Sequence, residues 1–307
     1  MASALGVIIT NNVTVSGAHA QPVYVDNTLP IGGGPAQAVI IAGGDIPQLG
    51  GPAIPVRYAP LGSPTVGPAM PIYVVSGYLP SAYGALVQSL GPIAYWPMDE
   101  QSGTVSVDQS GNGRNGAYTA VTLGQPGMGD GRTAASFDGT ASINNVFSTS
   151  MQSAFGSAEG TIALWAKVAN VGVWSDATVR RFATFQVDAN NRVYIEKVAG
   201  ANTFGYNYVA GGTAKNRNRT TSTTEWFHAC LTWSKSNDQV IAYFNGVQEG
   251  ATLTGLGVWA GSIVSTNTNI GANATTPTSV WSGLLAHAAV WNTPLSAAQV
   301  LTLAQVP

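Results

Sequence analysis

The chain has 307 residues, of which only 8% are charged, against about 25% in an average soluble domain. Its formal net charge of −2 offers no basic surface to nucleic acid or to an anionic membrane, which excludes both as partners. Gly, Ala, Ser, Thr and Asn take the place of the charged residues. That composition indicates either a turn-rich β-protein or a subunit of an assembly. Cys230 is the only cysteine, so an intrachain disulfide is impossible.

Residues 1–80 have the pattern of a repeat array. Four segments, each with a turn followed by a short apolar β-run, succeed one another at steps of 16, 17 and 16 residues, and 11 of the 17 prolines fall in this region. A constant period indicates a repeated supersecondary unit, and proline is tolerated at the first residue of a strand. The prolines expected to organise the array for assembly are Pro22, Pro35, Pro52, Pro55, Pro68 and Pro71.

The array has more apolar surface than it can bury. Strands this short do not cover both faces of a sheet by themselves, and their Val, Ile and Tyr content argues against disorder. We therefore expect residues 1–80 to associate with other copies, for example as a trimeric stalk, or to lie as an anchor across a partner's surface. A flexible proline-rich linker is the alternative.

A large β-domain follows a short linker. Residues 81–92 have helical spacing and are expected to form the linker, with the domain proper at 93–307. Short apolar runs separated by turn residues predict strands, and Ser296 with Gln299 forms a capping box that predicts a terminal helix. The fold class expected is an all-β sandwich of two sheets. The predicted strands include 161–168, 181–187, 192–198, 226–233, 240–244 and 284–291.

An ordered set of motifs in this domain resembles a known family, the laminin G-like branch of the concanavalin A-like lectin/glucanase superfamily. The resemblance covers about residues 83–307. The segments that carry it are IAYWPMDEQSG (93–103), DQSGNG (108–113), SFDG (136–139), TIALWAKV (161–168), WFHACLTW (226–233), YFNG (243–246), Ile270-Gly271 and VWNTPLSAAQV (290–300).

The resemblance implies a jelly roll that binds glycans, proteins or calcium, and some relatives cleave polysaccharides. Members of the family often carry an acidic pair in the closing strand. This chain has Ala286 and His287 there, so part of a calcium site would be missing.

Calcium remains a possible cofactor of the loop after the first strand of the domain. Calcium prefers six or more oxygen ligands, and Asp108, Asn112 and Asp99 are the candidate ligands, with Glu100 close by. The alternative is that Asp108 caps its own loop through backbone N–H groups.

Aromatic and basic side chains provide candidate contacts to glycans. Trp174, Tyr206, Tyr208 and Trp259 fall in or near expected loops, where exposed rings could stack on sugars. Burial in the core is the alternative for each of them. A basic segment, expected to be a loop and containing Lys215, Arg217 and Arg219, could hold an acidic glycan or a neighbouring subunit's carboxylate, or could simply be solvated.

Catalytic groups are not apparent. Glycoside hydrolysis requires two facing carboxylates, whereas Glu196 stands alone in its strand, and His228 and His287 lie in apolar strands as core histidines do. We therefore expect a protein that is not an enzyme and has no catalytic residues.

Together these features predict a bacteriophage virion protein, either a capsid decoration protein or a head or tail fibre. It would sit on the outer surface of the particle as a homo-oligomer and contact capsid or tail proteins. Its lectin-like domain would bind host or environmental glycans. The alternatives are a bacterial secreted or surface lectin or adhesin, which would be extracellular or at the cell surface, and a polysaccharide-degrading enzyme.

Overall fold

The computed structural model describes residues 6–7, 25–26, 82–200 and 202–305. The chain divides into two compact units, Met1–Tyr78 and Leu79–Pro307. In the first unit, β1 (Gly6–Val7) pairs antiparallel with β2 (Val25–Asp26). The predicted repeat array and its six named prolines lie outside the described residues. No helix in the described part of the chain is long and apolar enough to cross a membrane.

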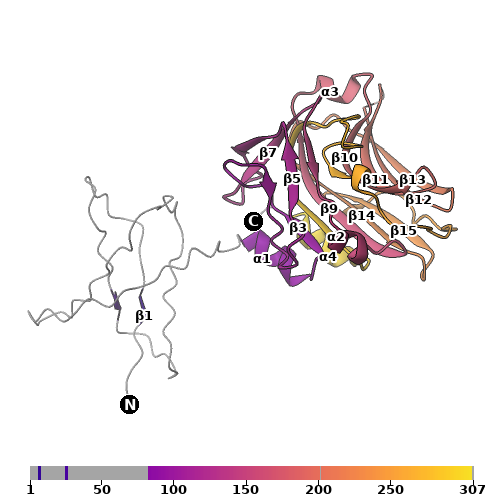
Figure 1. The fold of residues 1–307 in the computed structure, drawn as a ribbon, viewed down its shortest axis with the longest axis horizontal. Helices are drawn as coiled ribbons and strands as arrows, with labels where there is room; N and C mark the ends of the chain where they lie inside the picture. Colours follow the sequence, from indigo (N-terminus) through magenta and orange to yellow (C-terminus); the bar gives the residue numbers. More distant parts are fainter. Residues whose placement is uncertain (1–5, 8–24, 27–81, 201, 306–307) are drawn as a thin grey trace, which may run out of the picture. The chain divides into compact units, whose positions relative to one another are not determined.

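The second unit contains two antiparallel sheets (Figure 1), as the all-β fold class predicts. The strands of sheet 1, in spatial order, are β13 (Thr213–Thr220), β12 (Thr203–Ala210), β11 (Asn191–Val198), β10 (Arg180–Asp188), β17 (Thr268–Ile270), β8 (Ile143–Asn145), β5 (Gly116–Thr119) and β4 (Val105–Ser106).

Sheet 2 is also antiparallel, and β9 and β18 are the long strands at its centre. Its strands in spatial order are β16 (Val247–Gln248), β15 (Gln239–Phe244), β14 (Phe227–Ser234), β9 (Glu159–Val168), β18 (Ser282–Trp291), β7 (Thr133–Asp138) and β6 (Thr122–Pro126), with β3 (Ala94–Trp96) paired to β18. The helices are α1 (Ala82–Ser89), α2 (Thr149–Ala154), α3 (Gly172–Ser175), α4 (Ala297–Leu303) and the 3₁₀ turn η1 (Ser265–Asn267).

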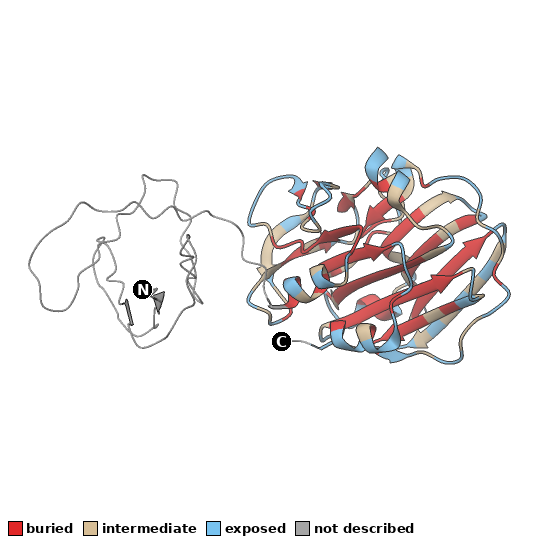
Figure 2. Ribbon diagram, turned by 90° about the horizontal axis from the view of Figure 1, so that it is seen from below, coloured by how far each residue is buried: buried red, intermediate tan, exposed pale blue. Residues whose placement is uncertain are grey.

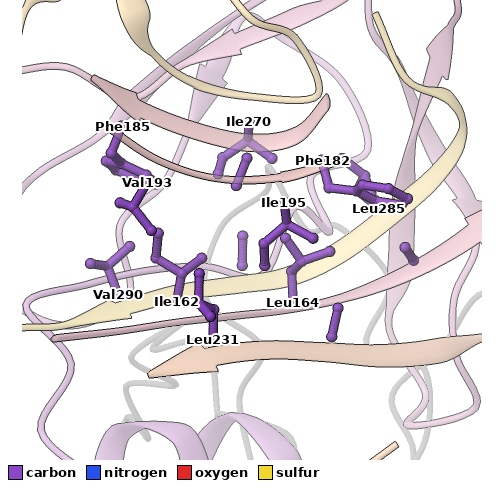
Figure 3. Close-up of a cluster of buried hydrophobic side chains, with 14 of the residues drawn as sticks. Ile162, Leu164, Phe182, Phe185, Val193, Ile195, Leu231, Ile270, Leu285 and Val290 are labelled. Carbon is purple, nitrogen blue, oxygen red and sulfur yellow. The ribbon is translucent and has the colours of Figure 1, made fainter. Parts of the chain in front are cut away.

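The core lies between the two sheets. Side chains alternate between the two faces of a strand, so each strand of the sandwich directs every second residue inward. In Figure 3, Ile162, Leu164 and Leu231 of sheet 2 face Val193 and Ile195 of sheet 1 across the interior, and all five are fully buried. Figure 2 shows that the central strands of this unit are buried along most of their length.

Helices α1 and α4 pack on the outer face of sheet 2 and form a second, smaller core. The hydroxyl of Tyr83 in α1 accepts a hydrogen bond from Trp165 Nε1 at 2.8 Å and donates one to the Leu303 carbonyl at 2.9 Å. The predicted capping box of Ser296 and Gln299 is confirmed at the start of α4. The helix predicted in the linker is therefore bound to the sandwich through Tyr83.

His287 lies under α1 at an irregularity in β18. Its backbone has φ of 53°, and the register with β9 shifts between Ala286 and Ala289. The imidazole Nδ1 lies 2.7 Å from the Tyr95 hydroxyl, and Nε2 lies 3.1 Å from Asp130 Oδ2. This histidine is a buried residue with polar neighbours at both ring nitrogens.

His228 on β14 faces the same second core and is fully buried. Neither ring nitrogen has a hydrogen-bond partner, and its closest aromatic neighbour is Trp165, with ring centroids 5.4 Å apart. Burial lowers the pKa of His228 to about 3. The imidazole is therefore neutral in the folded protein at any moderate pH.

This burial predicts a loss of stability in acid. The folded-state pKa lies below the ordinary histidine value of 6.5, so between the two values the unfolded chain binds more protons and the free energy of unfolding falls as the pH falls. The slope from this one group is at most about 1.4 kcal/mol per pH unit. Urea unfolding from pH 7 to pH 3.5 should show a shallower decline for His228→Leu than for the natural chain. Equal slopes in the two proteins would contradict this assignment.

Candidate functional site

Asp108 binds its own loop. Oδ1 accepts hydrogen bonds from the backbone N–H groups of Tyr95 and Ser110, both at 2.9 Å, and Oδ2 accepts one from the N–H of Arg114 at 2.8 Å. A carboxylate has about four acceptor positions, and three of them are taken here. The structure therefore supports the loop-capping alternative for this residue.

The side chains of the other two calcium candidates also bind groups of the protein itself. The Asn112 amide donates to the carbonyls of Pro92 and Ile93 at 3.3 and 3.1 Å. Asp99 is buried and forms an ion pair with Arg132. In the part of the chain that the structure describes, no group of three or more His, Cys, Asp or Glu side chains could hold a metal ion. The side chains of Asp99, Asp108 and Asn112 are thus engaged within the protein, and calcium binding by this loop stays a prediction.

Three of the four aromatic residues predicted to contact glycans are core residues. Trp174, Tyr206 and Tyr208 are buried, and their polar atoms bond to backbone carbonyls: Trp174 Nε1 to Thr223 O, Tyr206 to Tyr243 O and Tyr208 to Ser157 O. Each is at most 1% exposed and packs in the core between the two sheets, so the prediction is wrong for these three. Strand alternation is the reason for the two tyrosines, because even-numbered positions of β12 point inward.

Trp259 is only partly buried. Its ring packs against the core, with centroids 5.9 Å from Tyr208 and 6.1 Å from Phe155. Part of this residue therefore remains exposed, and its role as a glycan contact stays a prediction.

The basic segment is a strand rather than a loop. Lys215, Arg217 and Arg219 alternate along β13, the edge strand of sheet 1. Arg219 forms an ion pair with Glu249 and lies over the Phe244 ring, while Arg217 Nη2 donates to Ala251 O at 2.6 Å. These side chains point toward sheet 2 and close the edge of the sandwich. The prediction of a loop was wrong because an edge strand of this kind carries no apolar alternation.

The outer face of sheet 1 carries a polar row that crosses six strands. Residues paired across neighbouring strands lie side by side on one face of a sheet. The register aligns amides, a hydroxyl and one tyrosine in this order: Asn145, Asn269, Thr184, Tyr194, Asn207 and Asn216.

One end of the polar row is covered and the other is open. The turn that precedes β17 covers the Asn145 end, since Asn145 Nδ2 donates to Ser265 O at 2.9 Å and Asn269 Nδ2 donates to Thr266 O at 3.1 Å. Asn216 at the other end is exposed. The accessible part of the row therefore lies toward β13, while Tyr194 and Asn207 are 8% and 9% exposed.

Tyr194 lies in the middle of this face between charged neighbours, which together form what we call the Tyr194 cluster: Arg181, Arg192, Tyr194 and Glu196. The guanidinium carbons of Arg181 and Arg192 lie 3.5 and 5.2 Å from the Tyr194 ring centroid. Arg181 Nη2 lies 3.4 Å from Glu196 Oε2. Burial raises the pKa of Glu196, while Arg181 and Arg192 oppose that shift.

The sequence carries a signal for this cluster, although none of the predicted glycan contacts belongs to it. Arg192, Tyr194 and Glu196 stand at every second position of one strand, and such positions share a face. That Arg181 joins them depends on the pairing of β10 with β11, which the sequence alone does not specify.

The geometry of Asp108 predicts the response of the loop to substitution and to calcium. Asp108→Ala leaves three backbone N–H groups without their acceptor, so we expect a loss of about 1–3 kcal/mol in the free energy of unfolding. Addition of calcium chloride or of a chelator should leave the melting temperature of both proteins unchanged. A calcium-dependent rise in the natural chain that disappears in Asp108→Ala would show instead that the loop binds the metal.

Solved structures resemble the second unit in fold. The binding domain of Paraclostridial Mosquitocidal Protein 1 matches with a TM-score of 0.51 and 14% identity over 71% of this chain and 52% of that one. Domain 4 of an extracellular arabinanase from Geobacillus stearothermophilus, solved with arabinotriose, gives 0.49 and 20% over 70% of this chain and 98% of that one.

The binding domain of botulinum neurotoxin serotype D gives a TM-score of 0.49 and 11% identity over 70% of this chain and 51% of that chain. The matched part of this protein thus spans about half the length of the two toxin binding domains. Comparison with curated protein sequences gives no significant match.

A family profile gives the clearest assignment. It is described as the concanavalin A-like lectin/glucanases superfamily and matches residues 137–301, which is more than half of the 307 residues. The match includes β9, β14 and β18, the strands at the centre of sheet 2. The chain belongs to the concanavalin A-like lectin/glucanases superfamily.

Proposed function

We propose that the second unit is a non-catalytic carbohydrate-binding domain and that the open end of the polar row on sheet 1 is its binding face. The observation that carries this proposal is the alignment of Tyr194, Asn207 and Asn216 in one register across three neighbouring strands. The outer face of sheet 2, by contrast, is occupied by α1 and α4.

The chemistry of this face suits sugars. Amide side chains supply both a donor and an acceptor, as does each sugar hydroxyl. Asn216 and Asn218 alternate on β13 and both are exposed, and they lie beside Asn207 and Gly205 of β12. The side chains of a β-sheet are held at fixed spacing, so these donors and acceptors are ordered before a ligand arrives.

The same face supports the expectation that the protein is not an enzyme. A glycosidase needs two carboxyl groups about 5 to 9.5 Å apart. In β10–β13 the carboxylates are Glu196 and Asp188. Asp188 pairs with Asn191, which places it roughly 17 Å along the strand from Glu196 at about 3.4 Å per residue. Asp188 also accepts the backbone N–H of Asn190 within its own turn.

The whole chain serves, in this proposal, as a bacteriophage virion component, either a capsid decoration protein or a head or tail fibre. Residues 1–80 would bind other copies or a capsid or tail protein, with a trimer as one form. The support is the period of 16 to 17 residues in this region and the low content of charged residues, which suit a protein held in an assembly rather than dispersed by charge.

Glycan binding should depend on the exposed amides of β13. In a glycan array followed by titration calorimetry, Asn216→Ala combined with Asn218→Ala should weaken binding about tenfold or more, which corresponds to about 1.4 kcal/mol. Asn237→Ala is the control, because this exposed asparagine lies in the turn between β14 and β15. Equal affinity in the natural chain and the double variant would remove this face as the site.

The assembly role predicts that the protein purifies with a particle at fixed stoichiometry. Quantitative mass spectrometry of purified virions should find the chain at a constant ratio to the major capsid protein. A mature form that begins at Gln21 and is free in the medium would instead favour the secreted lectin. Release of reducing sugar from a polysaccharide panel would favour the enzyme.

A further inference from the structure

We propose that the Tyr194 cluster on sheet 1 is a subsite for the carboxylate group of an acidic sugar. This inference rests on the proposed function, since it specifies the class of glycan that the polar face would take. It is carried by the charge balance of the cluster, its unpartnered donors and its place in the polar row.

The cluster contains two positively charged groups and one negatively charged group, so its net charge is +1. Two guanidinium groups flank one tyrosine ring, and Glu196 is the carboxylate that faces them, 3.4 Å from Arg181. Among the described residues, Arg192 has no ion-pair partner within 4.0 Å. Like charges this close repel each other, and the repulsion is stronger in a partly buried site than in water. A second carboxylate would restore neutrality.

Several polar atoms of the face are buried without a hydrogen-bond partner. They are Arg181 Nε, Arg181 Nη1, Arg192 Nε and the Thr184 hydroxyl. Thr184 is fully buried and is paired directly with Tyr194. Native proteins satisfy most such groups, and leaving one unsatisfied costs about 1–3 kcal/mol. These four atoms lie on two neighbouring strands, so unsatisfied polar groups are concentrated around Tyr194.

The two arginines have different positions in the cluster. Arg181 lies over the Tyr194 ring with its inner nitrogens shielded from water. Arg192 is half-buried, and its two terminal nitrogens are partly exposed and have no hydrogen-bond partner. A carboxylate would therefore meet the guanidinium end of Arg192, with the charge of Arg181 behind it. Guanidinium binds carboxylate through two parallel hydrogen bonds, which fixes orientation as well as charge.

The other cations of the second unit with short carboxylate contacts each touch a carboxylate, although Lys197 and Arg180 share Asp176. Lys197 Nζ lies 2.5 Å from Asp176 Oδ1, Arg180 Nη2 lies 2.7 Å from Asp176 Oδ2, and Arg219 pairs with Glu249. In the Tyr194 cluster, by contrast, one of the two cations has no carboxylate in contact with it.

The remainder of the sugar would lie over β12 and β13. Asn207 is paired with Tyr194 on one side and with Asn216 on the other, and its Nδ2 is 3.4 Å from Glu196 Oε1. The carboxylate and the hydroxyl partners thus follow one line across the sheet. The ligand class is a carboxylate-bearing glycan, such as a uronic-acid or sialic-acid oligosaccharide.

The test compares each acid with its methyl ester. The full chain is titrated with oligogalacturonate and sialyllactose and with the methyl esters of both, which keep the sugar and remove the charge. We expect at least one acid to bind about tenfold or more tightly than its ester, and that preference to weaken as salt screens the charges. Arg192→Gln should lose about tenfold in affinity for the acid and none for the ester.

Lys167→Gln is the matched control. It also removes one positive charge, but Lys167 shares the face of Trp165 and Ala163 on the outer side of sheet 2. Its affinity for the acid should remain within about twofold of the natural chain. Arg192→Lys keeps the charge and loses the planar group, so a loss of affinity for the acid in that variant supports two-point binding. Melting curves of each variant verify that the chain is folded.

The outcomes separate the two proposals. Equal binding of acid and ester, or full acid binding by folded Arg192→Gln, overturns the carboxylate subsite and leaves the carbohydrate-binding function in place. Binding of neutral sugars alone has the same consequence. If neither the acids, their esters nor the neutral sugars of the array bind, both proposals fall.

Discussion

The interlocking of apolar side chains between two sheets is the interaction on which the rest of the structure depends. Residues of β9, β14 and β18 meet those of β10, β11 and β12 in one continuous cluster, with aromatic pairs such as Phe182 and Phe204, whose centroids are 4.8 Å apart. Burial of each large apolar side chain contributes roughly 1.5–3 kcal/mol. Because side chains alternate, every strand that contributes to this core also presents a second face outward.

The two outward faces have opposite roles for that reason. On sheet 2 most of the outward positions near the centre are apolar, and α1 and α4 pack on them, with Tyr83 joined to both Trp165 and Leu303. On sheet 1 most of the outward positions of β10–β13 are amides, hydroxyls and charged groups. A covered face stabilises the fold, whereas an open polar face with ordered side chains is available for a ligand.

The direction in which each side chain points also explains which sequence-based site predictions were wrong. Tyr206 and Tyr208 lie on the inward side of β12, and Arg219 of β13 turns toward the Phe244 edge of the core. Asp108 resembles a metal ligand by type, yet three backbone N–H groups use its oxygens. Arg192 alternates with Tyr194 and Glu196 along one strand, but the sequence does not show that Arg181 and Asn207 lie beside them on neighbouring strands.

The sequence by itself determined the fold class, the superfamily and the helix start at Ser296, because alternation, turn residues and capping depend on neighbours along the chain. It also indicated the central strands, since a short apolar run such as 226–233 is typical of a strand buried on both faces. Only the tertiary structure decided the candidate site. Arg181 and Arg192 belong to different strands, and the polar row exists only once six strands are in register. Register is set by long-range packing, so no local pattern specifies it.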